Sequence, residues 1–198
     1  MGTDPFNDVG CLVLPLIKSG GDMFKKCSFL FVFFLFVGEV LAFNLPPYGK
    51  LCGELKDLSG WKAEKCNGLN ATNPMGEMAS ATRTYTRDNL KLEVNLVLGT
   101  AAMAMATPMA FQQSLEINSP EEYLKVSNID GFKVSIHYDK KGHSGAVAVF
   151  LSDPPKNMNP ESMSRMAMLI VNFQNMDWKE ALSWAKKFDW KAIKASLK

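Results

Sequence analysis

The sequence predicts an α+β fold: an antiparallel β-sheet made of hairpins, with helices packed on one face and a C-terminal helix that closes the chain. Two features lead to this prediction. Several short runs alternate apolar with polar residues and are separated by polar turn residues, which is typical of β-hairpins. Residues 177–197 instead carry apolar side chains three and four positions apart, which is typical of amphipathic helices.

The strands are expected in two groups along the chain. The first group contains a hairpin whose turn is Asp88-Asn89, and Asn67-Gly68 is expected to be a turn before it. In the second group, Asp130-Gly131 has the composition of a tight hairpin turn. The strands that the alternation predicts are Trp61–Cys66, Ala81–Arg87, Leu90–Leu98, Leu115–Asn118, Tyr123–Ile129, Phe132–Asp139, Ala146–Leu151 and Met168–Gln174.

Two segments show mixed signals. Residues 43–59 contain two adjacent prolines and are expected to be irregular, with one or two helical turns. Gly99–Phe111 alternates alanine with methionine, which fits a strand, but both residues favour helices and Pro108 interrupts either element. We expect this segment to be a short helix or a loop packed on the sheet.

The end of the chain is predicted to form two consecutive helices. Asp177 and Glu180 have the spacing of a capping box, and Asp189 predicts that a second helix begins after Phe188. The apolar stripe of the first helix comprises Trp178, Ala181, Leu182 and Ala185. Trp184 lies about a quarter-turn from this stripe, so it is the aromatic residue that we expect to be exposed.

Residues 23–42 have the composition of a secretory signal peptide. Two lysines precede the uninterrupted apolar run Phe29–Val37, and the segment ends in Val40-Leu41-Ala42. The apolar run is short for a spanning helix, which needs about 20 apolar residues. Cleavage after Ala42 would leave residues 43–198 as a single α+β domain that is periplasmic or secreted.

Residues 1–22 are unsuited to the start of a signal peptide, because they contain Asp4 and Asp8 and end in Gly20-Gly21-Asp22. We interpret them as an upstream extension that precedes the true start of translation at Met23. Two alternatives stay open: an unusually long signal peptide, and an uncleaved anchor that uses both apolar runs. The membrane would be a partner only through this segment, if it is not cleaved.

Cleavage would leave two cysteines, Cys52 and Cys66. In an exported protein such a pair predicts one disulfide. Two free thiols in a reducing compartment are the alternative, and a metal site is disfavoured because no histidine lies near the pair in the sequence. The whole chain has 22 basic and 20 acidic residues, and this near balance argues against a nucleic-acid partner.

Four groups of residues carry a resemblance to known proteins. They are Gly60-Trp61, Ile129-Asp130-Gly131-Phe132, Tyr138-Asp139 with Ser144-Gly145, and Glu180-Ala181-Leu182 with Lys187-Phe188-Asp189. In these groups the chain resembles small exported bacterial proteins of uncharacterised function, and its strand order is similar to the Mog1/PsbP-like architecture. The resemblance covers about residues 61–197 and implies a periplasmic scaffold used for binding, without a catalytic signature.

The candidate catalytic and metal-binding motifs are weak. Gly142-His143-Ser144-Gly145-Ala146 partly matches the hydrolase motif G-x-S-x-G, but a β-rich run follows the serine where that motif needs a helix. His137, His143 and Asp139 could ligate a metal, yet two histidines across a turn form a weak site, and we expect their strand face to be solvated. No cofactor or metal is therefore expected.

Methionines supply the candidate binding residues. The two clusters are Met103, Met105 and Met109, and Met163, Met166 and Met168. Methionine is a flexible core residue that also suits adaptable binding grooves, and its thioether can bind Cu(I). We take Met103, Met105 and Met109, together with Trp184, as the candidate ligand-binding residues.

The expected function is that of an exported, non-enzymatic protein that binds a partner protein or a small apolar ligand. The alternatives are a periplasmic enzyme with an unrecognised site and a methionine-based copper-binding protein. A large pocket that converges on His137, Asp139 or Glu121 would favour the enzyme. Exposure of the first methionine cluster would favour copper or a ligand groove.

Overall fold

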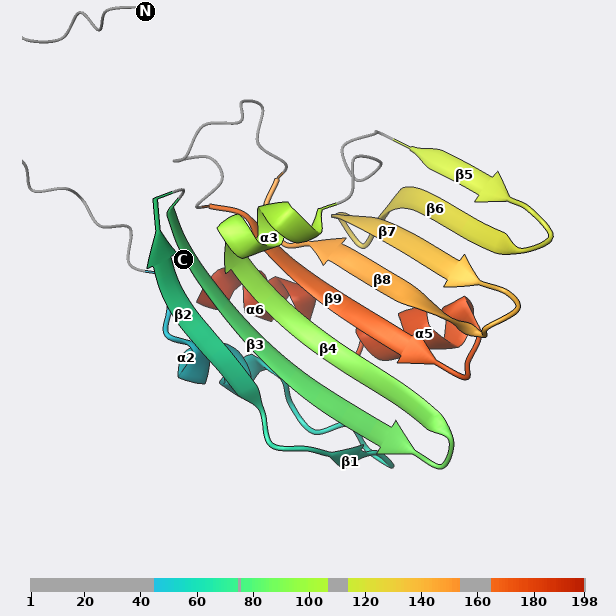
Figure 1. The fold of residues 1–198 in the computed structure, drawn as a ribbon, viewed down its shortest axis with the longest axis horizontal. Coiled ribbons are helices and arrows are strands. Elements are labelled where there is room, and N and C mark those ends of the chain that lie inside the picture. The colour runs from blue at the N-terminus through green and yellow to red at the C-terminus, as the bar shows by residue number, and fades with distance from the viewer. Residues whose placement is uncertain (1–44, 75, 107–113, 154–164, 198) are drawn as a thin grey trace, which may run out of the picture. The chain divides into compact units, whose positions relative to one another are not determined.

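The computed structural model describes residues 45–74, 76–106, 114–153 and 165–197. The chain divides after Ala42 into two units, Met1–Ala42 and Phe43–Lys198. All of the first unit lies outside the described residues, so the extension and the signal peptide stay predictions. The described residues belong to the second unit, in which one sheet is accompanied by helices (Figure 1).

The sheet is antiparallel throughout, and nine strands form it in the described part of the chain. Their bounds are β1 Lys62–Ala63, β2 Asn67–Asn73, β3 Gly76–Arg87, β4 Leu90–Gly99, β5 Leu115–Asn118, β6 Glu122–Ile129, β7 Phe132–Asp139, β8 Ser144–Phe150 and β9 Ala167–Gln174. The order across the sheet is β1-β3-β4-β9-β8-β7-β6-β5, and β2 also pairs with β3. The last strand of the chain, β9, therefore lies in the interior of the sheet and joins the two groups of strands (Figure 1).

The two predicted tight hairpins are present. Arg87 pairs with Leu90 at the end of the β3–β4 hairpin, and Asp88 in its turn has a φ of 55°. The β6–β7 turn has positive φ at both central residues, 54° at Asp130 and 85° at Gly131. Positive φ at both positions is what a type I′ hairpin turn requires, and glycine adopts it without a steric cost.

Strand β2 was not predicted from the sequence, and Asn67-Gly68 is the start of this strand instead of a turn. Its sequence, NGLNATN, is polar and shows no apolar alternation. β2 pairs with β3 alone, from Asn67 opposite Thr82 to Asn73 opposite Gly76. An edge strand buries little apolar surface. The extended conformation of β2 therefore comes from its backbone pairing with β3, and not from a pattern of apolar side chains.

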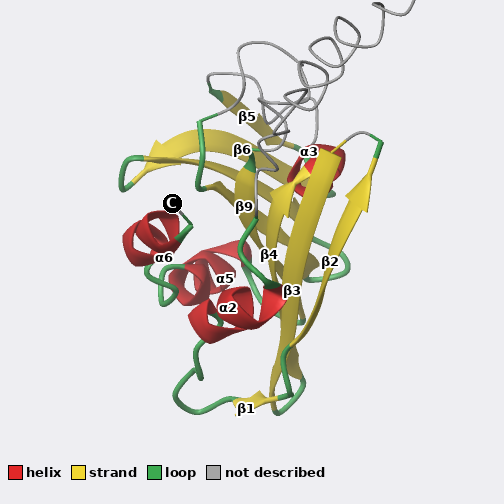
Figure 2. Ribbon diagram, turned by 90° about the vertical axis from the view of Figure 1, so that its left-hand side faces the viewer, coloured by secondary structure: helices red, strands yellow, loops and turns green. Residues whose placement is uncertain are grey.

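Helices lie against two separate apolar clusters. α2 (Tyr48–Glu54), α5 (Trp178–Ala185) and α6 (Trp190–Ser196) contribute to the main cluster, whereas α3 (Thr100–Met105) contributes to a second one. In β4, Leu96 and Leu98 belong to the main cluster and Val97 belongs to the second. Since successive strand residues point to opposite faces, the two clusters lie on opposite faces of the sheet (Figure 2). The sequence predicted helices on one face only.

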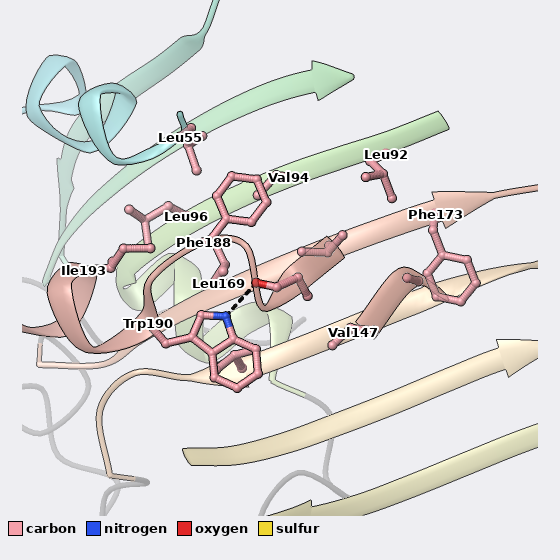
Figure 3. Packing of buried hydrophobic residues seen from close by; sticks show 14 of the residues in the cluster. Leu55, Leu92, Val94, Leu96, Val147, Leu169, Phe173, Phe188, Trp190 and Ile193 are labelled. Atoms are coloured by element: carbon pink, nitrogen blue, oxygen red, sulfur yellow. Dashed lines mark hydrogen bonds between the residues drawn. The ribbon is translucent and has the colours of Figure 1, made fainter. Parts of the chain in front are cut away.

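The main cluster holds the C-terminal helices on the sheet (Figure 3). Phe188, Trp190 and Ile193 are buried there among aliphatic residues of the strands. The indole N–H of Trp190 donates to the carbonyl oxygen of Ala185, at 2.8 Å, so the buried polar atom is paired. The closing helix is therefore fixed by both apolar burial and a hydrogen bond.

Helix α5 begins as predicted, and all four residues of its predicted apolar stripe contact the main cluster. The Asp177 carboxylate accepts a hydrogen bond from the backbone N–H of Lys179, at 2.8 Å, which confirms the N-cap. Ala181 and Ala185 are fully buried, whereas Trp178 and Leu182 of the stripe are partly buried. Trp184 is also partly buried, so the face that contacts the main cluster is wider than the predicted stripe.

The predicted disulfide is present between Cys52 and Cys66, whose Cα atoms are 5.8 Å apart. Cys52 lies in α2, and Cys66 immediately precedes β2. The bond therefore ties α2 to the start of the edge strand β2. Among the described residues, no helix has both the length and the hydropathy that a bilayer crossing needs.

Candidate functional site

An apolar groove of about 500 Å³ opens on the sheet face that carries α3. Strands β6 to β9 form its floor, and Met105 at the end of α3 forms one side. A volume of this size is within the range of pockets that hold small molecules. Another hollow, of about 540 Å³, is lined largely by charged and polar groups, including Lys140, Asp177 and Lys179. The groove beside α3 is therefore the better candidate for an apolar ligand.

Three rows of side chains cross the grooved face from β6 to β9, because residues opposite each other in paired strands point to the same face. The first row is Leu124, His137, Ala146 and Asn172. The second row is Val126, Ser135, Ala148 and Ile170. The third row is Asn128, Lys133, Phe150 and Met168.

Small side chains in the middle of these rows create the hollow. Ala146 and Ala148 of β8 and Ser135 of β7 line its floor. Val147, which lies between the two alanines, and Val149, which follows them, point to the other face. Both valines are fully buried in the main cluster. Strand β8 thus turns its two valines to the core, and its alanines and Phe150 to the groove.

The position of α3 closes the apolar end of the groove. Gly99, with a φ of 68°, turns the chain from β4 into α3, and a side chain at this position would collide with the backbone carbonyl oxygen of Glu77. Met103 packs on the second cluster, while the Met105 side chain is 46% exposed at the edge of the groove. Met168 lies in the floor near this end and is buried.

The opposite end of the groove is polar, with Glu122, His137 and Asn172 in its lining. An apolar surface continues sideways from it, because Ile117 of the edge strand β5 lies opposite Leu124 and is 47% exposed. The groove therefore has an open apolar flank and a polar end, which suits a ligand that is apolar over most of its length.

The structure brings together only part of the predicted ligand-binding set. Met105 lines the groove, and Met103 supports α3 from the second cluster. Met109 lies outside the described residues. Trp184 lies on the other face of the sheet, where it packs against the main cluster. Trp184 is therefore not part of the groove that Met105 lines, and a ligand-binding role for it stays a prediction.

Trp184 is held by contacts with other side chains of the folded chain. Its ring meets that of Trp61 edge to face, with centroids 5.3 Å apart, and the Arg87 guanidinium lies over both rings. The Glu180 carboxylate accepts hydrogen bonds from Arg87, at 3.0 Å, and from the Trp184 indole, at 3.3 Å. Glu180 therefore does not complete the predicted capping box with Asp177. These contacts partly bury the tryptophan that the sequence predicted to be exposed.

The two histidines do not form a joint site. His137 lines the groove, whereas Nδ1 of His143 is 3.0 Å from the hydroxyl of Tyr138, which belongs to the main cluster on the opposite face. Within the residues that the structure describes, no three His, Cys, Asp or Glu side chains gather in a way that could hold a metal ion. Ser144 begins β8, so a strand follows it and the hydrolase motif lacks its helix.

Comparison of the chain with protein-family models, with curated proteins and with solved structures gave no significant match. The resemblance to the Mog1/PsbP-like architecture therefore stays a prediction. The assignment of the site rests on the geometry of the groove.

Sequence reasoning missed most of the groove. Glu122 and the alanines of β8 were not among the candidate residues. One signal was readable: residues 146–149 alternate alanine with valine, so one face of the strand has only small side chains. A groove also needs neighbouring strands with low side chains at the same level, as Ser135 supplies, and that depends on register.

Proposed function

We propose that residues 43–198 form an exported, non-enzymatic protein that binds a small apolar ligand in the groove between α3 and strands β6 to β9. The observation that carries this proposal is an apolar groove of about 500 Å³ with alanines in its floor and an exposed methionine at its edge. Methionine adapts its shape to different apolar partners, so the edge can adjust to the ligand.

Two observations support export. The Cys52–Cys66 disulfide is typical of oxidising compartments outside the cytosol. The pattern of residues 23–42 adds a signal peptide ahead of the folded unit. We propose a periplasmic or secreted location on these grounds. In this proposal the helices of the main cluster, on the opposite face of the sheet, support the groove rigidly.

A fluorescence assay with the apolar dye N-phenyl-1-naphthylamine tests the binding function. The dye should bind the mature protein and brighten, and Ala148→Phe should weaken binding at least about tenfold because the new ring fills the floor of the groove. Ala195→Phe is the matched control, since Ala195 is exposed on α6, which packs on the opposite face. Equal binding by wild type and Ala148→Phe would refute the proposal.

The enzymatic alternative has one supporting observation, the presence of His137 in the groove. The His137 side chain has no hydrogen bond to another described residue, so no described group orients it as a general base. Asp139 and Glu121 do not line the groove. The binding function is therefore the stronger proposal.

The copper alternative uses the thioethers of Met105 and Met168, which both line the groove. Met105→Leu separates the two functions, because leucine keeps the apolar volume but lacks sulfur. Dye binding within about twofold of wild type is expected for an apolar site. Loss of Cu(I) binding in a competition assay, with dye binding intact, would instead support a metal role.

A further inference from the structure

The groove is polar at one end and apolar at the other. Glu122 lines the outer end, close to His137 of the first row. Phe150 and Met168 of the third row line the opposite end, beside α3. From Glu122 to Asn128, strand β6 advances by six residues, or about 20 Å. An elongated ligand that lies along the strands would therefore meet a different environment at each end.

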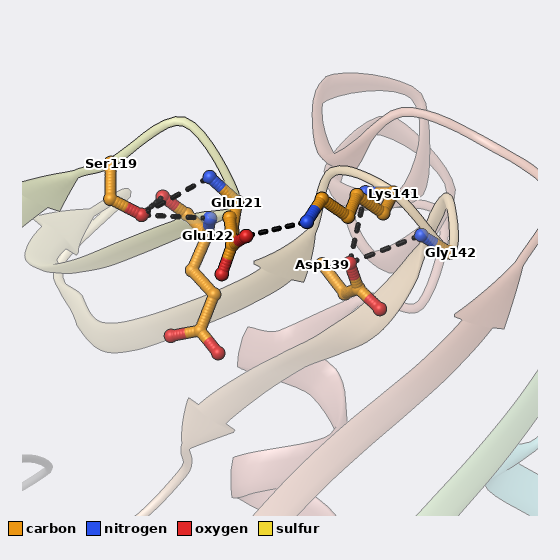
Figure 4. Close-up of polar contacts among 6 residues, drawn as sticks. All are labelled: Ser119, Glu121, Glu122, Asp139, Lys141 and Gly142. Atoms are coloured by element: carbon orange, nitrogen blue, oxygen red, sulfur yellow. Dashed lines mark hydrogen bonds and ion pairs between the residues drawn. The ribbon is translucent and has the colours of Figure 1, made fainter.

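Two carboxylates, those of Glu122 and Asp139, lie side by side at the polar end. Glu122 lies directly opposite Asp139 of β7, and like charges in this arrangement destabilise a sheet. The neighbouring cation is already engaged, because Lys141 pairs with Glu121 at 2.5 Å. Figure 4 shows the Glu122 carboxylate turned away from this ion pair. No cation among the described residues pairs with Glu122.

Asp139 keeps its negative charge through backbone hydrogen bonds. The N–H groups of Gly142 and Lys141 donate to its Oδ1 atom, at 3.1 and 2.9 Å, and they lower the pKa of the carboxyl group (Figure 4). Both donors bind the Oδ1 atom, so they leave the Oδ2 atom of Asp139 free of these two hydrogen bonds. Glu122 therefore lines the outer end of the groove, and Asp139 lies beside it on the neighbouring strand, just beyond the lining residues.

Other cations on this face lie away from the polar end. Lys91 shares the row of Glu122 but lies on β4, four strands across the sheet. Lys133 lies in the third row and does not line the groove, and burial lowers the pKa of its ammonium group. Negative charge thus dominates the outer end, and a complementary headgroup is cationic.

We propose that the groove binds a single-chain amphipathic cation, that is, an alkyl chain with an ammonium headgroup. The ammonium group binds at Glu122 and Asp139, and the chain lies over Ala146 and Ala148 toward Phe150. Small side chains leave room for the chain, and the ammonium group gives Glu122 the counter-charge that it lacks among the described residues. This inference rests on the proposed function and adds the charge and the orientation of the ligand.

Displacement of N-phenyl-1-naphthylamine by three dodecyl compounds tests the proposal. Dodecylammonium should displace the dye more strongly than dodecanol, by about threefold to tenfold, and dodecanoate should be the weakest. The compounds are used below their micelle-forming concentrations, with Ala148→Phe as the blocked groove. The preference for ammonium should shrink in high salt, since salt screens exposed charges.

Two charge-matched variants locate the headgroup. Glu122→Gln should abolish the preference for dodecylammonium over dodecanol. Glu121→Gln removes the same charge one residue earlier, on a side chain that pairs with Lys141 outside the groove, and it should leave the preference intact. The two variants have the same overall charge and composition as each other, so any difference between them comes from the position of the lost carboxylate.

The outcomes separate this inference from the proposed function. Dye binding that Ala148→Phe blocks, without any preference for ammonium, would overturn the inference and leave the apolar groove in place. A preference for dodecanoate would also overturn it and would place an anionic headgroup toward Lys133. If Glu122→Gln and Glu121→Gln changed the preference for dodecylammonium equally, the inference would also be overturned. Absence of dye binding in the wild type would overturn both proposals.

Discussion

Replacing Ile193 by alanine should destabilise the protein strongly, because α6 is held on the sheet by this residue and its neighbours. Ile193 is 2% exposed in the main cluster (Figure 3). The change removes three carbon groups, which at about 0.8 kcal/mol for each buried CH₂ gives about 2.4 kcal/mol of transfer free energy. A cavity term adds to this, so the free energy of unfolding should fall by about 3–4 kcal/mol.

Two further variants test whether burial is the cause. Leu182→Ala should cost only about 1–2 kcal/mol, because Leu182 is half-buried in α5. Lys191→Ala, on the exposed side of α6, should change stability by less than about 0.5 kcal/mol. Urea denaturation followed by far-ultraviolet circular dichroism, with the disulfide intact, measures all three. The reasoning is refuted if Leu182→Ala is as damaging as Ile193→Ala, or if Lys191→Ala exceeds either.

Three other predictions concern the disulfide, processing and pH. Cys52 and Cys66 should resist alkylation until reduced, and replacing both by alanine should lower the free energy of unfolding by about 2–4 kcal/mol in urea denaturation. Mass spectrometry of the exported protein should find an N-terminus at or beside Phe43, and a mature chain that retains the first residues of the sequence would contradict the signal peptide. Burial raises the pKa of Tyr85 from 10.0 to about 12, so its contribution to stability should be complete below pH 10 and lost as pH rises toward about 12. Tyr85→Phe should remove that alkaline loss in denaturation curves, although it also loses the 2.8 Å hydrogen bond to Lys56.

The hairpins and the C-terminal helices were predictable because their signals are local. The alternation in β4 and the Asp130-Gly131 turn specify backbone conformation within a few residues. The Asp177 cap likewise depends on the N–H group of a residue two positions away. Such interactions need no information about the rest of the chain, so a reading of the sequence finds them.

The environment of Trp184 was not predictable in the same way. Helical periodicity places Trp184 beside the apolar stripe and does not say what covers it. The cover comes from Arg87, which is far away in sequence and offers its guanidinium to Trp184 and Glu180. A contact of this kind exists only after β3 and α5 have come together.

By itself, the sequence determined that this protein is an α+β chain with hairpin turns, two capped C-terminal helices and one pair of cysteines in its folded part. Only the tertiary structure decided that β9 enters the sheet between β4 and β8 and so places residues of distant strands in common rows. The groove follows from that register, because Ala148 forms a hollow only when Ser135 lies beside it and α3 folds back over Met168. Side-chain size is written in the sequence, but which small side chains become neighbours depends on strand pairing across the whole chain.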